Sequence, residues 1–338
     1  MSHRRNWVFA ALVFALGVLP AEAQVDRVRD PNWTVPRLPD GQPDLQGKWG
    51  NKTITPIERS ERESRAYLTD EEMASLNQRR ADAQDAQDAA PEQRYEAGGN
   101  VGGYGSYWLD AGDTVLPTGQ TSMVMEPPSG RVEIKQWALD AKAYNLANEG
   151  DHYQHMSVWD RCISRGVPGS MLPAGYNNVY RIMQTADHVA IHYEMIHDVR
   201  VIPFDKQVHV HDNITMWMGD SRDYWDGDVL VVESKNFHNR GWIASSMAGR
   251  RLKGIPTSTA LHVVERFERV SEHIIMWDAT VSDPNVYDSE WTISMPLTAK
   301  LDYVMFEYAC HEGNYSVPNA LSGERAIDRM VAEANDGQ

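Results

Sequence analysis

Residues 190–205 (AIHYEMIHDVRVIPFD) place histidine, carboxylate and arginine side chains within one alternating pattern. Tyr193 and His197 fall in one set of alternate positions, and Glu194 and Arg200 fall in the other. Strict alternation is typical of a half-buried β-strand, and a strand of this length is expected to bend near His197. Histidine titrates close to neutral pH, and arginine can bind a carboxylate or an oxyanion. The stretch therefore suits general acid–base chemistry.

Residues 260–270 (ALHVVERFERV) form a second group of the same kind. His262 and Arg266 share one face of the strand that this pattern predicts, while Glu265 lies on the other face among apolar neighbours. A carboxylate in such surroundings must be paired or must have a raised pKa. We therefore count Glu265 among the candidate catalytic groups.

Residues 303–310 are expected to form the last strand, with Glu307 and Tyr308 on opposite faces. This strand runs directly into a dense polar cluster around His311. The glycine-rich residues 96–113 lack both a preceding strand and a following GK[ST], which disfavours a phosphate-binding loop. We expect them to form a mobile flap that carries Trp108 toward the mouth of a pocket.

These patterns define the expected site, which is a polar pocket with a histidine acid or base. The expected catalytic residues are His197, His262, Glu265, Glu307 and His311. The expected binding residues are Glu194, Arg200, Tyr193, Arg266, Tyr308 and Trp108. The alternative is an internal salt-bridge network, for example between Arg266 and Glu307, with the histidines facing water.

Two histidine pairs have spacings found in metal sites, namely His209 with His211 and His152 with His155. In a strand, positions i and i+2 share a face, as a metal-binding barrel requires. No glutamate follows His211 at the distance that would complete a cupin-type set, so we expect no metal. A Ser-His-Asp hydrolase is also disfavoured, because the chain has no G-x-S-x-G motif.

The N-terminus has the three parts of a secretory signal peptide: Arg4 and Arg5, an apolar run over residues 8–19, and Ala-Glu-Ala at 21–23. We expect residues 1–23 to be cleaved, the alternative being an uncleaved anchor. No later apolar run is long enough for a transmembrane segment. The formal charge of the 338-residue chain is −16, which disfavours nucleic acid and other polyanionic partners.

Cys162 and Cys310 are the two cysteines of the chain. An even number of cysteines in an exported protein predicts a disulfide, because the compartment outside the cytoplasm is oxidising. The alternative is a pair of separate buried thiols, since free cysteine is a common core residue.

Short strands with turn signals between them predict a mainly β fold, an antiparallel up-and-down barrel similar to the lipocalins with about eight strands. The predicted strands span 178–184, 188–204, 221–225, 228–236, 260–270, 273–281, 291–297 and 303–310, and a first strand at 45–53 would help closure. A two-sheet sandwich is the alternative. Residues 176–316 would form the barrel, and residues 317–338 a tail. Residues 24–175 would wrap it, with helices at 68–89 and 137–148 and a small hairpin at 121–134.

Five strings in the chain resemble a large family of exported bacterial proteins whose function is not established: DGQPDLQGKWGN, WDRCISRGVPGSMLP, MGDSRDYWDGDVLVVESKNF, ALHVVERFERV and YACHEGNYS. The resemblance covers nearly the whole mature chain. It implies an envelope or secreted location and places the two cysteine-bearing strings in one framework, but it assigns no catalytic residue. A weaker resemblance to lipocalin-like barrels rests on Gly-x-Trp at 47–49 and on the number of strands.

We expect an exported enzyme that acts on a small organic molecule within the barrel by acid–base chemistry, of the lyase, isomerase or hydrolase type. Such reactions need no cofactor, and the sequence contains no cofactor motif. The alternative is a periplasmic carrier or sensor of a small hydrophobic or phenolic ligand, with some of the 11 tryptophans and 14 tyrosines as its pocket walls. A third possibility is an envelope scaffold without a ligand.

Overall fold

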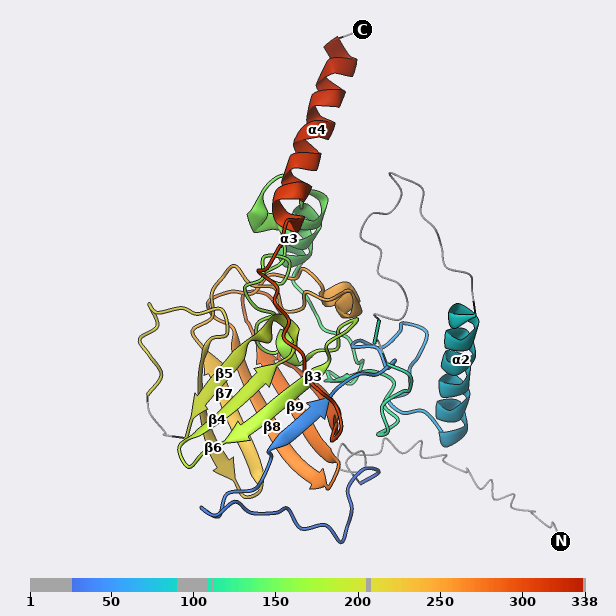
Figure 1. The fold of residues 1–338 in the computed structure, drawn as a ribbon, viewed down its shortest axis with the longest axis vertical. Helices are drawn as coiled ribbons and strands as arrows, with labels where there is room; N and C mark the ends of the chain where they lie inside the picture. Colours follow the sequence, from blue (N-terminus) through green and yellow to red (C-terminus); the bar gives the residue numbers. More distant parts are fainter. Residues whose placement is uncertain (1–25, 90–108, 111, 205–207, 337–338) are drawn as a thin grey trace, which may run out of the picture.

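The computed structural model describes residues 26–89, 109–110, 112–204 and 208–336. Its centre is one antiparallel sheet that curls into a nearly closed barrel (Figure 1). Nine strands follow the order β5-β4-β3-β1-β10-β9-β8-β7-β6, and β2 pairs with β10 beside this path. The mainly β, antiparallel barrel predicted from the sequence is therefore confirmed.

The elements have the following bounds. The strands are β1 Gly47–Gly50, β2 Val124–Glu126, β3 Val179–Gln184, β4 His188–Tyr193, β5 Val199–Pro203, β6 Asp220–Asp226, β7 Val229–Lys235, β8 His262–Ser271, β9 Ile274–Ser282 and β10 Trp291–Ala299. The α-helices are α2 Asp70–Asp88, α3 Gln136–Ala147 and α4 Ser316–Asp336.

Local sequence explains several of these boundaries. Gly227, between β6 and β7, has a φ of 63°, a conformation that glycine adopts without a steric penalty and that a tight hairpin requires. At the start of α2, Thr69 accepts a hydrogen bond from the backbone N–H of Glu72, whose side chain accepts one from the Thr69 N–H. These two bonds form a capping box, and the helix predicted at 68–89 is confirmed as α2, which has no buried residue.

The expected bend in residues 188–204 is a complete reversal of the chain. A short 3₁₀ turn at Met195–His197 separates β4 from β5, and the two strands pair with each other antiparallel. Ile196 and His197 have φ values of 66° and 60°, which β-branched and bulky residues rarely adopt. The turn therefore carries backbone strain that the neighbouring strands must hold in place.

Large side chains fill the lumen of the barrel. Alternate positions of the strands point inward. The largest fully buried side chains among them are Trp49, Trp277, Trp291, Tyr193 and Phe267, each at most 1% exposed. They belong to one hydrophobic cluster that runs through the sheet. The interior along the described strands is therefore a packed core.

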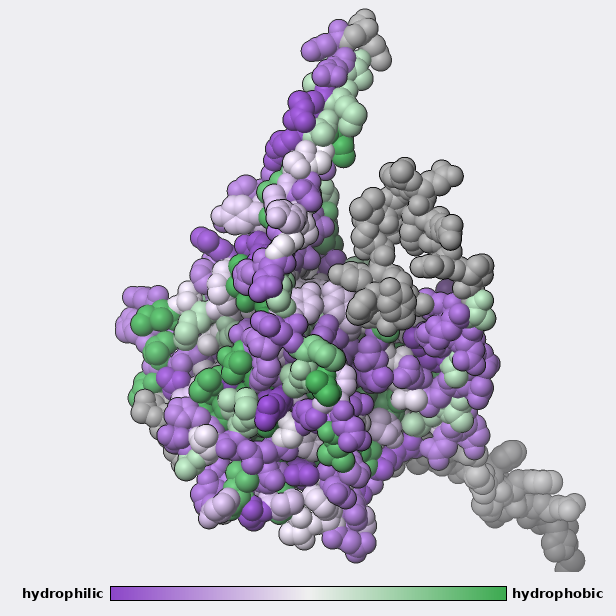
Figure 2. Space-filling model, in the orientation of Figure 1, coloured by the Kyte–Doolittle hydropathy of each residue, from purple (hydrophilic) through white to green (hydrophobic). Residues whose placement is uncertain are grey.

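The structure corrects two expectations, one about residues 303–310 and one about residues 121–134. Residues 303–310 do not form a strand; they are an irregular segment. The expected hairpin at 121–134 is absent, because β2 pairs with β10 and Ile134 bridges to Tyr287. Most of the expected C-terminal tail, residues 317–338, is helix α4, which has no buried residue and extends away from the barrel beyond α3 (Figure 1 and Figure 2).

The turn after β4 gives a prediction for the pH dependence of stability. Burial lowers the pKa of His192, and the neighbouring His197, whose Nδ1 lies 3.3 Å from His192 Nε2, lowers it further. As the pH falls below the ordinary histidine pKa of about 6.5, the unfolded chain takes up a proton before folded His192 does. The free energy of unfolding should therefore decrease between about pH 7 and pH 5, and decrease less in His192→Gln. Urea titrations across this range test the prediction; equal pH slopes in the two proteins would contradict it.

Candidate functional site

Glu265, a predicted catalytic residue, lies inside the barrel and forms an ion pair with Arg200, a predicted binding residue. The Arg200 Nη1 to Glu265 Oε2 distance is 2.5 Å, and both side chains are at most 3% exposed. Trp277 Nε1 donates to the other carboxylate oxygen at 3.1 Å. Tyr193 packs in the same core. Burial raises the pKa of its hydroxyl, and the positive charge of Arg200 lowers that pKa by a smaller amount.

Arg200 also spans the opening between β5 and β6, the two end strands of the sheet. Arg200 lies on β5. This strand lies next to β6, but the two are not paired in the sheet. Arg200 Nε donates to Ser221 Oγ on β6 at 2.9 Å, and Nη2 donates to Ser234 Oγ on β7 at 2.6 Å. The guanidinium therefore links β5 to β6, β7 and β8. We assign this group a structural role, that of holding the barrel closed.

The predicted histidines lie outside the lumen. His197 is exposed in the turn after β4, and His311 is exposed in the C-terminal segment. His262 lies on the outer face of β8, where its Nε2 is 2.7 Å from Glu233 Oε1. His209 lies near this pair and bonds to Asp220 through Nδ1 at 2.9 Å.

The hydrogen bond to His262 lowers the pKa of Glu233, as expected for a carboxylate beside an imidazole that can become charged. Glu233 and His262 are each more than a third exposed, and water therefore screens their attraction.

Three other predicted binding residues are accounted for separately. Glu194 is fully buried at the end of β4 and accepts hydrogen bonds from Tyr303 Oη at 2.9 and 3.0 Å and from the Phe306 N–H at 3.3 Å. It thereby fixes the irregular segment to the barrel. Arg266 pairs with Asp226 at 3.0 Å on the outer surface. Trp108, with most of the expected flap, lies outside the described residues.

The predicted disulfide between Cys162 and Cys310 is confirmed. It fixes a hollow outside the barrel, of about 570 Å³, between two segments of the chain. We call this hollow the aromatic pocket; its lining residues are Trp159, Asp160, Tyr176, Glu307, Tyr308, Ala309, Cys310, Gly313, Asn314, Tyr315 and Ser316. Glu307 and Tyr308, predicted on opposite faces of a strand, both line it.

Three rings of the aromatic pocket form a row. The ring centroids of Trp159 and Tyr176 are 6.2 Å apart, and those of Tyr176 and Tyr308 are 6.3 Å apart with the planes inclined by 19°. Asn314 donates to Asp160 O at 3.4 Å, which ties the two walls together beside the disulfide. The pocket therefore combines a row of rings with two acidic residues, Asp160 and Glu307. Asp160 Oδ2 already accepts a hydrogen bond from Ser157 Oγ at 2.5 Å.

Arg165 lies behind this row of rings. Its guanidinium carbon is 5.6 Å from the centroid of the Trp159 ring, and its Nη2 donates to Leu172 O at 3.0 Å. Arg165 is 3% exposed and forms no ion pair with a carboxylate among the residues that the structure describes. Burial lowers the pKa of Arg165 to about 10. A buried cation against one face of an indole orients that ring and reduces its mobility.

Sequence reasoning missed Trp159, Asp160, Tyr176 and Arg165. The signal for most of them was present, because Trp159, Asp160 and Arg165 flank Cys162 in the string WDRCISRG. A disulfide between this string and YACHEGNYS necessarily brings their neighbours together. Tyr176 had no comparable signal.

The histidine pairs considered as metal ligands make local contacts. His152 and His155 have ring centroids 6.0 Å apart, and His211 Nδ1 accepts from the Asn213 N–H at 3.2 Å. Within the described ranges, no group of three or more His, Cys, Asp or Glu side chains could hold a metal ion.

Comparison of the chain with protein-family models, with curated proteins and with solved structures gives no match. Membership of the exported bacterial family therefore stays a prediction. None of the helices in the described ranges is both long and apolar enough to cross a bilayer.

Proposed function

We propose that this chain binds a small hydroxylated aromatic molecule in the aromatic pocket, outside the barrel lumen. The observation that carries the proposal is the row of Trp159, Tyr176 and Tyr308 beside the carboxylates of Asp160 and Glu307. Aromatic rings favour offset-stacked or edge-to-face contacts with another ring, each worth about 0.5–1.5 kcal/mol beyond the area buried. A carboxylate accepts a hydrogen bond from a ligand hydroxyl, and such charge-assisted bonds are the stronger kind.

The packing of the barrel supports this location. The inward positions near Glu265 are occupied by large side chains, and Glu265 is already paired with Arg200 and bonded to Trp277. A ligand in the lumen would have to displace that core. The aromatic pocket is open to solvent and needs no such displacement.

Acid–base catalysis on the same ligand is the second candidate, favoured by Glu307 in the pocket wall. A carboxylate that accepts a hydrogen bond from a hydroxyl is placed to take its proton as a general base. The chemistry would be of the lyase, isomerase or hydrolase type and would need no cofactor. In this proposal Glu307 transfers the proton and Tyr308 contacts the ring.

The disulfide supports a location outside the cytoplasm, since such bonds persist in oxidising compartments. We propose export to the periplasm or the medium. The signal peptide expected at residues 1–23 lies outside the described residues.

The test is binding of 4-methylphenol and catechol, measured by calorimetry on the full chain. We expect Trp159→Leu to weaken binding by about tenfold or more, which corresponds to about 1.4 kcal/mol. Trp137→Leu is the matched control, because Trp137 is 47% exposed on α3 and does not line the pocket. Equal losses in the two variants, or no binding of either phenol, would contradict the proposal.

Glu307→Gln distinguishes catalysis from carriage. For any phenolic compound that the chain consumes, this variant should retain binding within about twofold and lose turnover. Glu312→Gln, an exposed carboxylate that does not line the pocket, is the control. Turnover that survives in Glu307→Gln would contradict the role of Glu307 as the base, and binding without turnover in the unaltered chain would leave carriage as the function of this pocket.

A further inference from the structure

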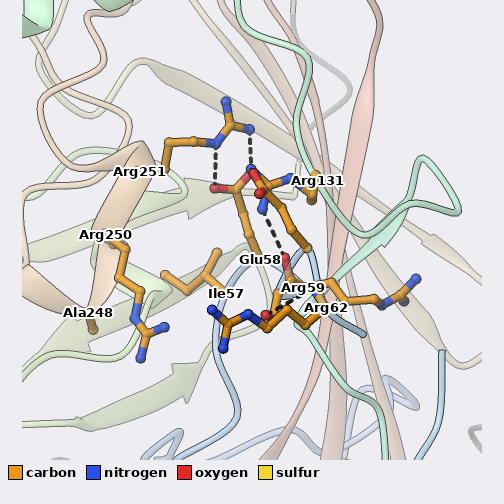
Figure 3. Close-up of a pocket in the computed structure, with 11 residues that line it drawn as sticks. Ile57, Glu58, Arg59, Arg62, Arg131, Ala248, Arg250 and Arg251 are labelled. Atoms are coloured by element: carbon orange, nitrogen blue, oxygen red, sulfur yellow. Dashed lines mark hydrogen bonds and ion pairs between the residues drawn. The ribbon is translucent and has the colours of Figure 1, made fainter. Parts of the chain in front are cut away.

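A second hollow, of about 350 Å³, lies on another part of the molecule and is lined by arginines (Figure 3). We call it the arginine pocket; its lining residues are Ile57, Glu58, Arg59, Ser60, Glu61, Arg62, Arg131, Ala248, Gly249, Arg250 and Arg251. Five arginines and two glutamates therefore meet in one place. This local excess of positive charge stands out in a chain whose net charge is −16.

Both glutamates of the arginine pocket are already paired. Glu58 binds Arg251 through both carboxylate oxygens, at 2.6 and 3.0 Å (Figure 3). Glu61 pairs with Arg131 at 3.0 Å. The three remaining arginines of the pocket form no ion pair with a carboxylate among the described residues; they are Arg59, Arg62 and Arg250.

Arg59 is the most buried of the three, at 3% exposure. Its Nε donates to Thr121 Oγ1 at 2.9 Å and its Nη1 to Pro128 O at 2.6 Å. Its Nη2 is buried and has no hydrogen-bond partner in the described chain. Glu63 lies near enough to attract Arg59 but forms its ion pair with Arg65. A buried guanidinium with an unused donor is costly, and an anion that reached Nη2 would supply the missing partner.

Arg250 carries an independent sign of function. It has φ 47° and ψ −111°, a conformation that non-glycine residues rarely adopt, within the 3₁₀ turn Met247–Leu252. Strain of this kind persists only where the surroundings impose it, and it is concentrated at ligand-binding positions. Lys142 supports the same turn by donating from Nζ to Arg251 O at 2.6 Å, and it adds another positive charge nearby.

We infer that the arginine pocket binds a small molecule carrying a multiply charged oxyanion, either a phosphate ester or a polycarboxylate. Planar guanidinium groups match the geometry of both oxyanions and can bind them through two parallel hydrogen bonds. The overall negative charge and the size of the hollow favour a small molecule over a nucleic acid. This is a site separate from the aromatic pocket, with which it shares no lining residue.

The experiment is calorimetric titration of the full chain with pyrophosphate and, separately, with citrate. The variant is Arg62→Ala/Arg250→Ala, and the charge-matched control is Arg79→Ala/Arg329→Ala, two exposed arginines on α2 and α4. We expect the pocket variant to weaken binding of at least one anion by about tenfold or more and the control to leave it unchanged. Thermal unfolding of each variant confirms that it is folded.

The two anions distinguish the source of the oxyanion. Tighter binding of pyrophosphate would assign a phosphate ester, and tighter binding of citrate would assign a polycarboxylate. If anion binding were weakened equally in the two double variants, the effect would come from net charge alone. That result would overturn the inference. Absence of binding by both anions in the unaltered chain would also overturn it, whatever the result for the aromatic pocket.

Discussion

Replacing Arg200 with methionine is expected to destabilise the protein by about 3–5 kcal/mol, because the substitution leaves the Glu265 carboxylate buried without its cation. Glu265 is fully buried, and Trp277 would be its remaining hydrogen-bond donor among the contacts described for its carboxylate. The substitution also removes the link from β5 to Ser221 on β6. Urea unfolding followed by tryptophan fluorescence measures the loss.

The double variant Arg200→Met/Glu265→Leu tests whether the lost stability comes from the unpaired carboxylate. Apolar side chains of similar volume can replace a buried ion pair at little cost or with a gain, so we expect it to recover most of the lost stability. Arg266→Met is the matched control, since the side chains of Arg266 and Asp226 are 42% and 61% exposed and surface pairs of this kind contribute about 0–1 kcal/mol. A single Arg200 variant as stable as that control would contradict the role assigned to Arg200.

Removing the disulfide as Cys162→Ser/Cys310→Ser is expected to cost about 2–5 kcal/mol. The two cysteines are 148 positions apart, so the bond closes a long loop and restricts the unfolded chain strongly. Because Cys310 lines the aromatic pocket and Glu194 fixes the segment only as far as Phe306, binding of a phenol should be weakened as well. Thermal unfolding and calorimetry of the variant and of the reduced wild type measure both effects.

Two outcomes would contradict this account of the disulfide. One is an unchanged unfolding midpoint in both the serine variant and the reduced protein. The other is full phenol affinity in the variant, which would mean that the pocket walls are held by other contacts, such as the bond from Asn314 to Asp160.

Local signals in the sequence predict much of the barrel. Alternation in residues 260–270 places Glu265 on the face opposite His262 and Arg266, and the structure has this arrangement. The tight turn at Gly227 and the capping box at Thr69 are also set by a few neighbouring residues. Such features are predictable because their physical causes lie within a short stretch of chain.

Long-range contacts set the limit of that reasoning. Residues 303–310 alternate like a strand, yet their course is determined by Glu194, by the disulfide and by Lys48, which donates to Tyr303 O. Alternation alone does not distinguish a paired strand from an extended segment that is held by side chains. The segment therefore lies outside the sheet.

The candidate site also combines features that local sequence predicts with features that depend on long-range contacts. The sequence indicated that Glu265 needs a partner, but Arg200 lies 65 positions away and the pairing depends on how the barrel closes. The arginine pocket joins residues 57–62, 131 and 248–251, which no local pattern relates. The aromatic pocket became visible only where the disulfide brings two segments together.

The central proposal is that the ligand binds outside the lumen, and indole NMR of the ¹⁵N-labelled chain tests it most directly. The chain has 11 tryptophans, and single leucine substitutions assign the signals of Trp159 in the aromatic pocket and Trp277 in the barrel core. On titration with 4-methylphenol we expect the Trp159 signal to shift and the Trp277 signal to stay unchanged. A saturable shift of Trp277 without one of Trp159 would place the ligand inside the barrel and contradict the proposal.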